Sequence, residues 1–126
     1  MSGAIQVQAA KELLEKGLGN LIIDMSMDLE DPRIFIKMRD GVHVYVQYND
    51  HDQYSYSILF STGILDRYRF DNYDDHWPVS SRPHHFHPRL NKQAFESKMT
   101  GKPKKDIPIL CDLIKKGKAF LDTFRF

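Results

Sequence analysis

Five β-rich runs before residue 72 constrain the fold of this chain more than any other feature. Two pairs of runs are separated by the short turns Asp40-Gly41 and Thr62-Gly63, and Asp-Gly between such runs is a strong hairpin signal. In the first run apolar residues alternate with Asp and Ser, as in a strand with one wet face. We therefore predict an antiparallel meander of about five strands. The predicted strands cover residues 21–29, 34–39, 42–48, 54–61 and 65–71.

Helical patterns flank the meander. Apolar residues at helical spacing predict a first helix over residues 4–16, and a short helix is also predicted over 91–99. A last helix follows the basic linker 101–105, with Asp106 as its N-cap and Pro108 in its first turn. Its predicted buried stripe is Leu110, Leu113, Ile114, Leu121 and Phe124. This order of elements indicates an α+β domain with the N-terminal and C-terminal helices packed on one face of the meander.

The other face of the sheet has candidate occupants in four tyrosines of the predicted strands. They are Tyr45, Tyr54, Tyr56 and Tyr68. An aromatic sheet surface can stack bases or contact a protein partner. The alternative is ordinary strand composition, because tyrosine has a high β propensity. An open edge of the meander would also allow a homodimer.

Composition indicates one small domain. The chain has 126 residues, of which 41% are hydrophobic, so we predict a single domain over residues 1–126. No apolar run is long enough to span a bilayer and no signal peptide is evident, so we expect a cytoplasmic protein without a membrane partner. Cys111 lies in an apolar helical pattern, which favours a small buried side chain over a nucleophile.

The formal net charge of +1 conceals an uneven distribution of charge. Residues 1–81 are acidic on balance, whereas residues 82–118 are basic. Clustered Lys and Arg attract phosphate, so the basic part can mark an anionic partner. A solvated basic helix would give the same distribution.

Four of the six histidines lie close together in a long irregular segment predicted over residues 73–90. They are His76, His84, His85 and His87. Connections of this length are often functional. In an extended chain between Pro83 and Pro88, His85 and His87 would point to one side and His84 to the other. Two imidazoles can then converge on one ligand.

Metal binding is one use of this His-rich loop. The candidate ligands are the imidazoles of His76, His85 and His87 and one carboxylate from Asp71, Asp74 or Asp75. Such a set suits zinc or another divalent transition metal. The spacing matches none of the usual metal signatures, because the chain has neither His-Glu-x-x-His nor a cysteine pair.

Metal-free acid and base chemistry on RNA is a second use. One imidazole can deprotonate a ribose 2′-hydroxyl while another protonates the leaving oxygen. The candidate phosphate-binding residues are Arg82, Arg89 and Lys92. A structural role is the third use, with the imidazoles bonded to backbone groups of the loop or to the aspartates around residue 74. Asp71 and Asn72 can likewise be an ordinary turn at the end of a strand.

Two short motifs connect this region to a known family. Arg69-Phe70-Asp71-Asn72 is followed, after ten residues, by Pro83-His84-His85-Phe86-His87. This pattern resembles the TumE-like toxins of prokaryotic toxin–antitoxin pairs, many of which are described only as a domain of unknown function. In that family a tyrosine-rich strand ends before Asp-Asn, and Pro-His-His-x-His follows at similar spacing. His76 is a weaker match, because the family often has a paired histidine where this chain has Asp75-His76.

The resemblance implies a toxin paired with an adjacent DNA-binding antitoxin, and for many such toxins the target is RNA. It implies an active-site group of Asp71, Asn72, His84, His85 and His87. The leading interpretation is therefore a toxin component that acts on RNA through its His-rich loop, with no cofactor. A non-catalytic RNA- or protein-binding module and a metal-dependent hydrolase remain as alternatives.

Overall fold

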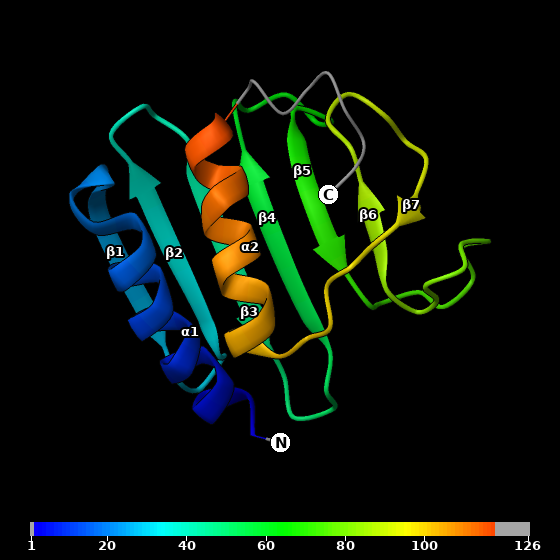
Figure 1. Cartoon of the computed structure of the whole chain (residues 1–126), viewed down its shortest axis with the longest axis horizontal. Coiled ribbons are helices and arrows are strands. Elements are labelled where there is room, and N and C mark those ends of the chain that lie inside the picture. Colours follow the sequence, from blue (N-terminus) through cyan, green and yellow to red (C-terminus); the bar gives the residue numbers. More distant parts are fainter. Residues whose placement is uncertain (1, 118–126) are drawn as a thin grey trace.

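The computed structural model describes residues 2–117, which form two long helices and one antiparallel sheet (Figure 1). The helical elements are α1 (Gly3–Leu18), the 3-10 helix η1 (Gly19–Leu21) and α2 (Pro103–Lys116). The strands are β1 (Ile22–Asp28), β2 (Arg33–Met38), β3 (His43–Tyr48), β4 (Tyr54–Leu59), β5 (Arg67–Asp71), β6 (His85–His87) and β7 (Phe95–Glu96). None of the described helices has the length and apolar composition needed to cross a membrane.

The sheet is a meander in which the strands lie in chain order from β1 to β7. Helices α1 and α2 lie side by side over the same face, as Figure 1 shows. The predicted α+β class and the packing of both helices on one face are therefore confirmed. The predicted number of strands is wrong, because the sheet has seven strands rather than about five.

Turn chemistry sets the register of the central hairpin. Gly41 has a φ of 88°, a left-handed conformation that costs glycine little. Asp40 precedes it and accepts a hydrogen bond at Oδ1 from the Val42 amide, at 3.1 Å. The predicted Asp40-Gly41 turn therefore joins β2 to β3, and the predicted turn at Thr62-Gly63 lies between β4 and β5.

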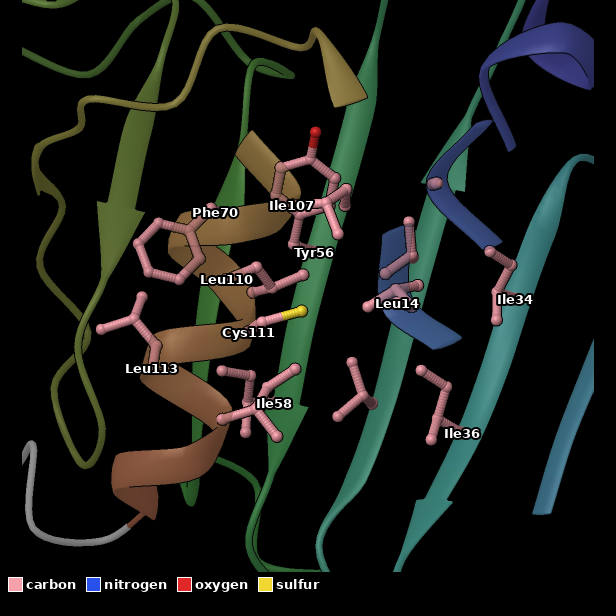
Figure 2. Close-up of a cluster of buried hydrophobic side chains, with 14 of the residues drawn as sticks. Leu14, Ile34, Ile36, Tyr56, Ile58, Phe70, Ile107, Leu110, Cys111 and Leu113 are labelled. Atoms are coloured by element: carbon pink, nitrogen blue, oxygen red, sulfur yellow. The ribbon is translucent and has the colours of Figure 1, made fainter. Parts of the chain in front are cut away.

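One row of paired residues forms the centre of the core. From β2 to β6 the row is Ile34, Val46, Tyr56, Phe70 and Phe86, and every member is fully buried. Side chains of α2, including Leu110 and Cys111, pack against this face (Figure 2). Cys111 is buried, as predicted. Of the predicted stripe of α2, Leu121 and Phe124 lie outside the described residues.

Three of the four candidate tyrosines lie on this helix-covered face, so the structure favours ordinary strand composition over a tyrosine-rich open face. Tyr54, Tyr56 and Tyr68 are almost completely buried. Tyr56 alternates in phase with Ile58, and Tyr68 with Phe70, so the apolar parity of each strand takes the tyrosines into the core. Of the four, Tyr45 alone lies on the open face, with 37% of its surface exposed.

The irregular segment predicted over 73–90 contains strand β6, and the helix predicted over 91–99 is absent. Phe86 stacks on Phe70 with ring centroids 4.6 Å apart, and burial of such a side chain contributes about 2 kcal/mol. This contact holds β6 in the sheet, although its three residues are too few to show a periodic pattern. In place of the predicted helix, β7 pairs with β6 through Phe95 and Phe86, so long-range pairing overrides a weak local preference.

Asp106 lies inside α2 rather than at the predicted N-cap position. The helix begins at Pro103, and Lys102 occupies the N-cap position. The buried Asp106 carboxylate accepts hydrogen bonds from the Gly101 amide at 2.7 Å and the Thr100 amide at 2.8 Å. A side chain of α2 itself, Asp106, therefore holds the segment that leads into the helix.

Candidate functional site

His85 and His87 lie on the open face of the sheet, opposite the helices. They flank Phe86 in β6, and because Phe86 points into the core, its two neighbours point away from it. Their ring centroids are 4.9 Å apart, so the predicted convergence of the two imidazoles is confirmed. Their cross-strand partners in β5 are Asp71, opposite His85, and Arg69, opposite His87.

Asp71 and His85 form the buried part of the site. Oδ1 of Asp71 lies 3.0 Å from His85 Nε2, and the Pro83 carbonyl oxygen lies 2.9 Å from His85 Nδ1. Asp71 also accepts a hydrogen bond from Arg69 Nε at 2.7 Å and one from the Tyr73 amide at 3.0 Å. Both nitrogens of His85 thus face oxygen acceptors, which fixes the orientation of the ring.

His87 is the more accessible of the two histidines. It is half-buried, and burial lowers the pKa of its imidazole below the usual value, as do the neighbouring His85 and Arg67. Asp71 and a hydrogen bond with the Gln93 backbone act on this pKa in the opposite direction. An imidazole with a lowered pKa is neutral at pH 7 and can accept a proton from a substrate.

Trp77 covers one side of the histidines. Its ring centroid lies 5.1 Å from that of His87 and 5.8 Å from that of His85. His76 is exposed, and its ring stacks on Trp77 with the centroids 4.9 Å apart. The segment after β5 therefore folds back over β6 and contributes an aromatic wall to the site. Sequence reasoning did not select Trp77, since nothing but its presence among the histidines marked it.

Two arginines that sequence reasoning missed complete the site. Arg67 and Arg69 alternate with Asp71 along β5, so all three share the open face. Arg69 keeps 44% of its side chain exposed, and Arg67 Nη1 donates to the Pro88 carbonyl at 3.0 Å. Burial, together with Arg69, lowers the pKa of Arg67. The alternation of Arg, Arg and Asp in a predicted strand was the signal that could have revealed them.

The three predicted phosphate-binding residues lie outside β5 and β6, and two of them form ion pairs. Arg82 is exposed and forms an ion pair with Asp75, with Nε 3.1 Å from Oδ1. Arg89 forms an ion pair with Asp66. The guanidinium of Arg89 also lies over the ring of Phe60, 4.7 Å from its centroid. Lys92 is exposed. Arg67 and Arg69 are therefore the cations nearest to the paired histidines in the sheet.

His84 and Asn72 contact Tyr54 rather than the residues of the open face. The ring of His84 stacks on Tyr54, and its Nδ1 lies 2.9 Å from the Tyr54 hydroxyl. Burial lowers the pKa of His84. Asn72 accepts a hydrogen bond from the Tyr54 amide and donates one to the Asp52 carbonyl, each at 2.9 Å. The structure thus places both residues around Tyr54, with His84 against its buried side chain and Asn72 against its backbone.

A metal ion could be held by Asp71, His85 and His87. These residues offer three donor atoms within 4.8 Å of one another, and two imidazoles with one carboxylate suit a transition metal. A hydrogen bond donated by His85 Nδ1 to the Pro83 carbonyl oxygen would leave Nε2 for the metal. Such an ion would have to replace the bond between Asp71 and His85. The other predicted ligands, His76, Asp74 and Asp75, are exposed.

A comparison with protein families assigns the chain. The model of the toxin TumE matches residues 11–115, which include the second half of α1, the whole sheet and nearly all of α2. The chain belongs to the TumE toxin family. No curated protein and no solved structure matches it. The TumE match covers each residue of the site on the open face, and it supports a role as a toxin.

Proposed function

We propose that this TumE-family toxin cleaves RNA on the open face of its sheet, with His87 as the general base. The observation that carries the proposal is the position of the accessible His87 imidazole. It lies beside the cations Arg67 and Arg69 and against a second imidazole, His85, that a buried carboxylate holds. A proton acceptor next to guanidinium groups is the arrangement that phosphodiester cleavage requires.

The reaction follows from the chemistry of RNA. His87 takes the proton of a ribose 2′-hydroxyl, and the 2′-oxygen forms a bond to the adjacent phosphorus. The bond from phosphorus to the 5′-oxygen breaks, and the leaving oxygen takes a proton from water. The hydroxide so formed takes the proton from His87, which restores the neutral ring. The products are a 2′,3′-cyclic phosphate and a 5′-hydroxyl end.

The surrounding residues act on charge and orientation. Arg67 and Arg69 balance the additional negative charge on the phosphate oxygens in the transition state. Asp71 holds both Arg69 and His85, through Oδ2 and Oδ1 respectively. His85 in turn lies against the His87 ring and limits its rotation. Asp71 and His85 are therefore positioning residues in this proposal.

The test compares purified wild-type protein with the His87→Ala variant on a labelled RNA. General bases contribute about 10²- to 10⁴-fold to such rates, so we expect a loss of that order in the variant. His51→Ala is the matched control, because His51 is an exposed histidine of the turn between β3 and β4. A single 2′-deoxy substitution at the cleaved position should block the reaction. Cleavage that survives this substitution, or that His87→Ala retains, would contradict the proposal.

Growth after induction in a bacterial host tests the same site in cells. Wild-type protein should arrest growth and His87→Ala should not, with soluble expression of both confirmed. Membership of a toxin family also supports a protein antitoxin as the partner of this chain. Co-expression with the product of the neighbouring gene should then restore growth.

A metal-dependent hydrolase is the second candidate, because three donor atoms of Asp71, His85 and His87 lie within 4.8 Å. The two candidates differ in their chemistry. A hydrolase that activates water would leave no cyclic phosphate, would cleave the 2′-deoxy substrate and would lose activity with a chelator. For the proposed reaction with His87 we expect a cyclic phosphate product, no cleavage of the 2′-deoxy substrate and full activity with a chelator. About one equivalent of tightly bound zinc, nickel or manganese in active protein would favour the second candidate.

A further inference from the structure

We propose that the substrate is single-stranded RNA that crosses the open face from β6 to β2, at right angles to the strands, with bases stacked on Tyr45 and Phe35. This inference rests on the proposed function, since it takes the phosphate to lie at His87. It adds the class of RNA, the path of the strand and two residues that bind bases.

A straight row of residues connects His87 to the two aromatic rings. His87 is paired with Arg69, Arg69 with Ser57, Ser57 with Tyr45, and Tyr45 with Phe35. All five belong to the open face, because the row alternates with the buried row through Phe70. Neighbouring strands lie about 4.8 Å apart, which places Tyr45 roughly 14 Å and Phe35 roughly 19 Å from His87.

The two aromatic residues form a platform at the far end of this row. Tyr45 is 37% exposed and Phe35 is half-buried, with ring centroids 5.0 Å apart. His43 contacts the Phe35 ring edge to face, at 5.2 Å. A hollow of about 810 Å³ bordered by Phe35, Tyr45 and the loop after β1 adjoins the platform. Aromatic rings at the edge of a hollow can stack on bases and receive their neighbours.

The charges on this face match a phosphate chain. Arg69 belongs to the row itself, and three further cations lie beside the row on the same strands: Arg33 and Lys37 in β2 and Arg67 in β5. In the described strands from β2 to β5, Asp71 is the one acidic residue of the open face, and it is bound to Arg69 and His85. The other acids of this face lie in β1 and β7, where Asp28 is paired with Arg33, Asp24 with Lys37 and Glu96 with His85. Arg33 also approaches Asp31, at 3.4 Å.

A single strand fits these observations better than a duplex. The platform can stack only on unpaired bases, whereas the bases of a duplex are already stacked and paired. Ser57 lies between Tyr45 and Arg69 in the row, and its small side chain leaves the path open. Because every base has a flat face, we expect little dependence on sequence.

Binding without cleavage is the direct test. Fluorescence anisotropy would use a labelled single strand of about ten nucleotides and the His87→Ala protein, which leaves the RNA intact. Stacking is worth about 1 to 3 kcal/mol per base, so Tyr45→Ala should raise the Kd about 5- to 150-fold. Tyr45→Phe should retain binding, and Phe35→Ala should weaken it. A hairpin duplex of the same sequence should bind less tightly than the single strand.

Gln47→Ala is the matched control, because Gln47 follows Tyr45 on the same strand and face without an aromatic ring. We expect its Kd to stay within about twofold of the parent protein. An unchanged Kd in Tyr45→Ala, or tighter binding of the duplex, would overturn the proposed path. Loss of antitoxin binding in Tyr45→Ala, with RNA binding intact, would also overturn it and would assign the platform to a protein partner.

The outcome separates this inference from the proposed function. If the wild-type protein cleaves RNA while Tyr45→Ala binds normally, the cleavage stands and the path is wrong. If the wild-type protein cleaves no RNA while single-strand binding depends on Tyr45, the path stands and the catalytic role of His87 is wrong.

Discussion

His87 lies between groups that act on its pKa in opposite directions. Burial, His85 and Arg67 lower it, whereas Asp71 raises it. A general base acts in its unprotonated form, so the cleavage rate should rise with pH through the His87 pKa and level off above it. Because burial lowers this pKa, the rate should reach its plateau at a lower pH than it would with an ordinary histidine. Arg67→Gln removes a nearby cation, so we predict a higher pKa and an acid limb shifted to higher pH.

Cleavage rates between about pH 5 and pH 8 would show this shift as a larger loss of activity at the acid end. Arg67→Lys keeps the positive charge and should keep the limb nearly in place. Arg82→Gln is a control, because Arg82 is exposed and paired with Asp75. If Arg67→Gln and Arg82→Gln give the same limb as the wild type, a different group limits the rate.

The sequence predicted part of the site at this scale. Alternation within an extended segment was enough to place His85 and His87 together, and the motif added Asp71. The sequence did not distinguish His84 from His85 and His87, because a histidine that stacks on a buried tyrosine looks the same in sequence as one that faces a ligand. Arg69 lies two residues before Asp71 in a predicted strand, so the two side chains share a face. The distribution of charge along the chain does not show this, and Arg69 was therefore missed as a site residue.

At the scale of elements, Asp106 decides how α2 begins. Its carboxylate accepts hydrogen bonds from Tyr56 Oη and from the amides of Thr100 and Gly101, all between 2.7 and 2.8 Å. Asp106→Ala would leave these buried donors without an acceptor. We predict that it lowers the free energy of unfolding by about 3 kcal/mol, measured by urea denaturation. Asp112→Ala, at an exposed position of the same helix, should change it by less than about 0.5 kcal/mol.

The elements were predictable where periodicity was long. The first five strands and both helices have enough alternating or helical repeats to be recognised. The observed ends of α1 and of these strands differ from the predicted ones by at most two residues, whereas α2 has its N-cap at Lys102 rather than at Asp106. Strands β6 and β7 have three and two residues, too few for a period. They exist because Phe86 and Phe95 complete a row of buried and partly buried side chains, which is a property of the assembled sheet.

At the scale of the whole molecule, the sheet separates stability from the proposed activity. One face buries the row from Ile34 to Phe86 under the helices, and the other carries His87, Arg69 and Tyr45. Substitutions on the two faces should therefore have different effects. We predict that Leu110→Ala lowers the free energy of unfolding by about 3 kcal/mol because it opens a cavity in the core. His87→Ala should cost less than about 1 kcal/mol.

The effects on growth should run the other way. At a temperature where both variants remain folded, Leu110→Ala should still arrest growth after induction, because the open face is unchanged. His87→Ala should be tolerated by the host although it is the more stable of the two. Circular dichroism and urea unfolding of the purified variants would give their stability, and soluble protein per cell would correct for expression. A folded Leu110→Ala protein without toxicity would show that the helix-covered face takes part in the toxic activity as well.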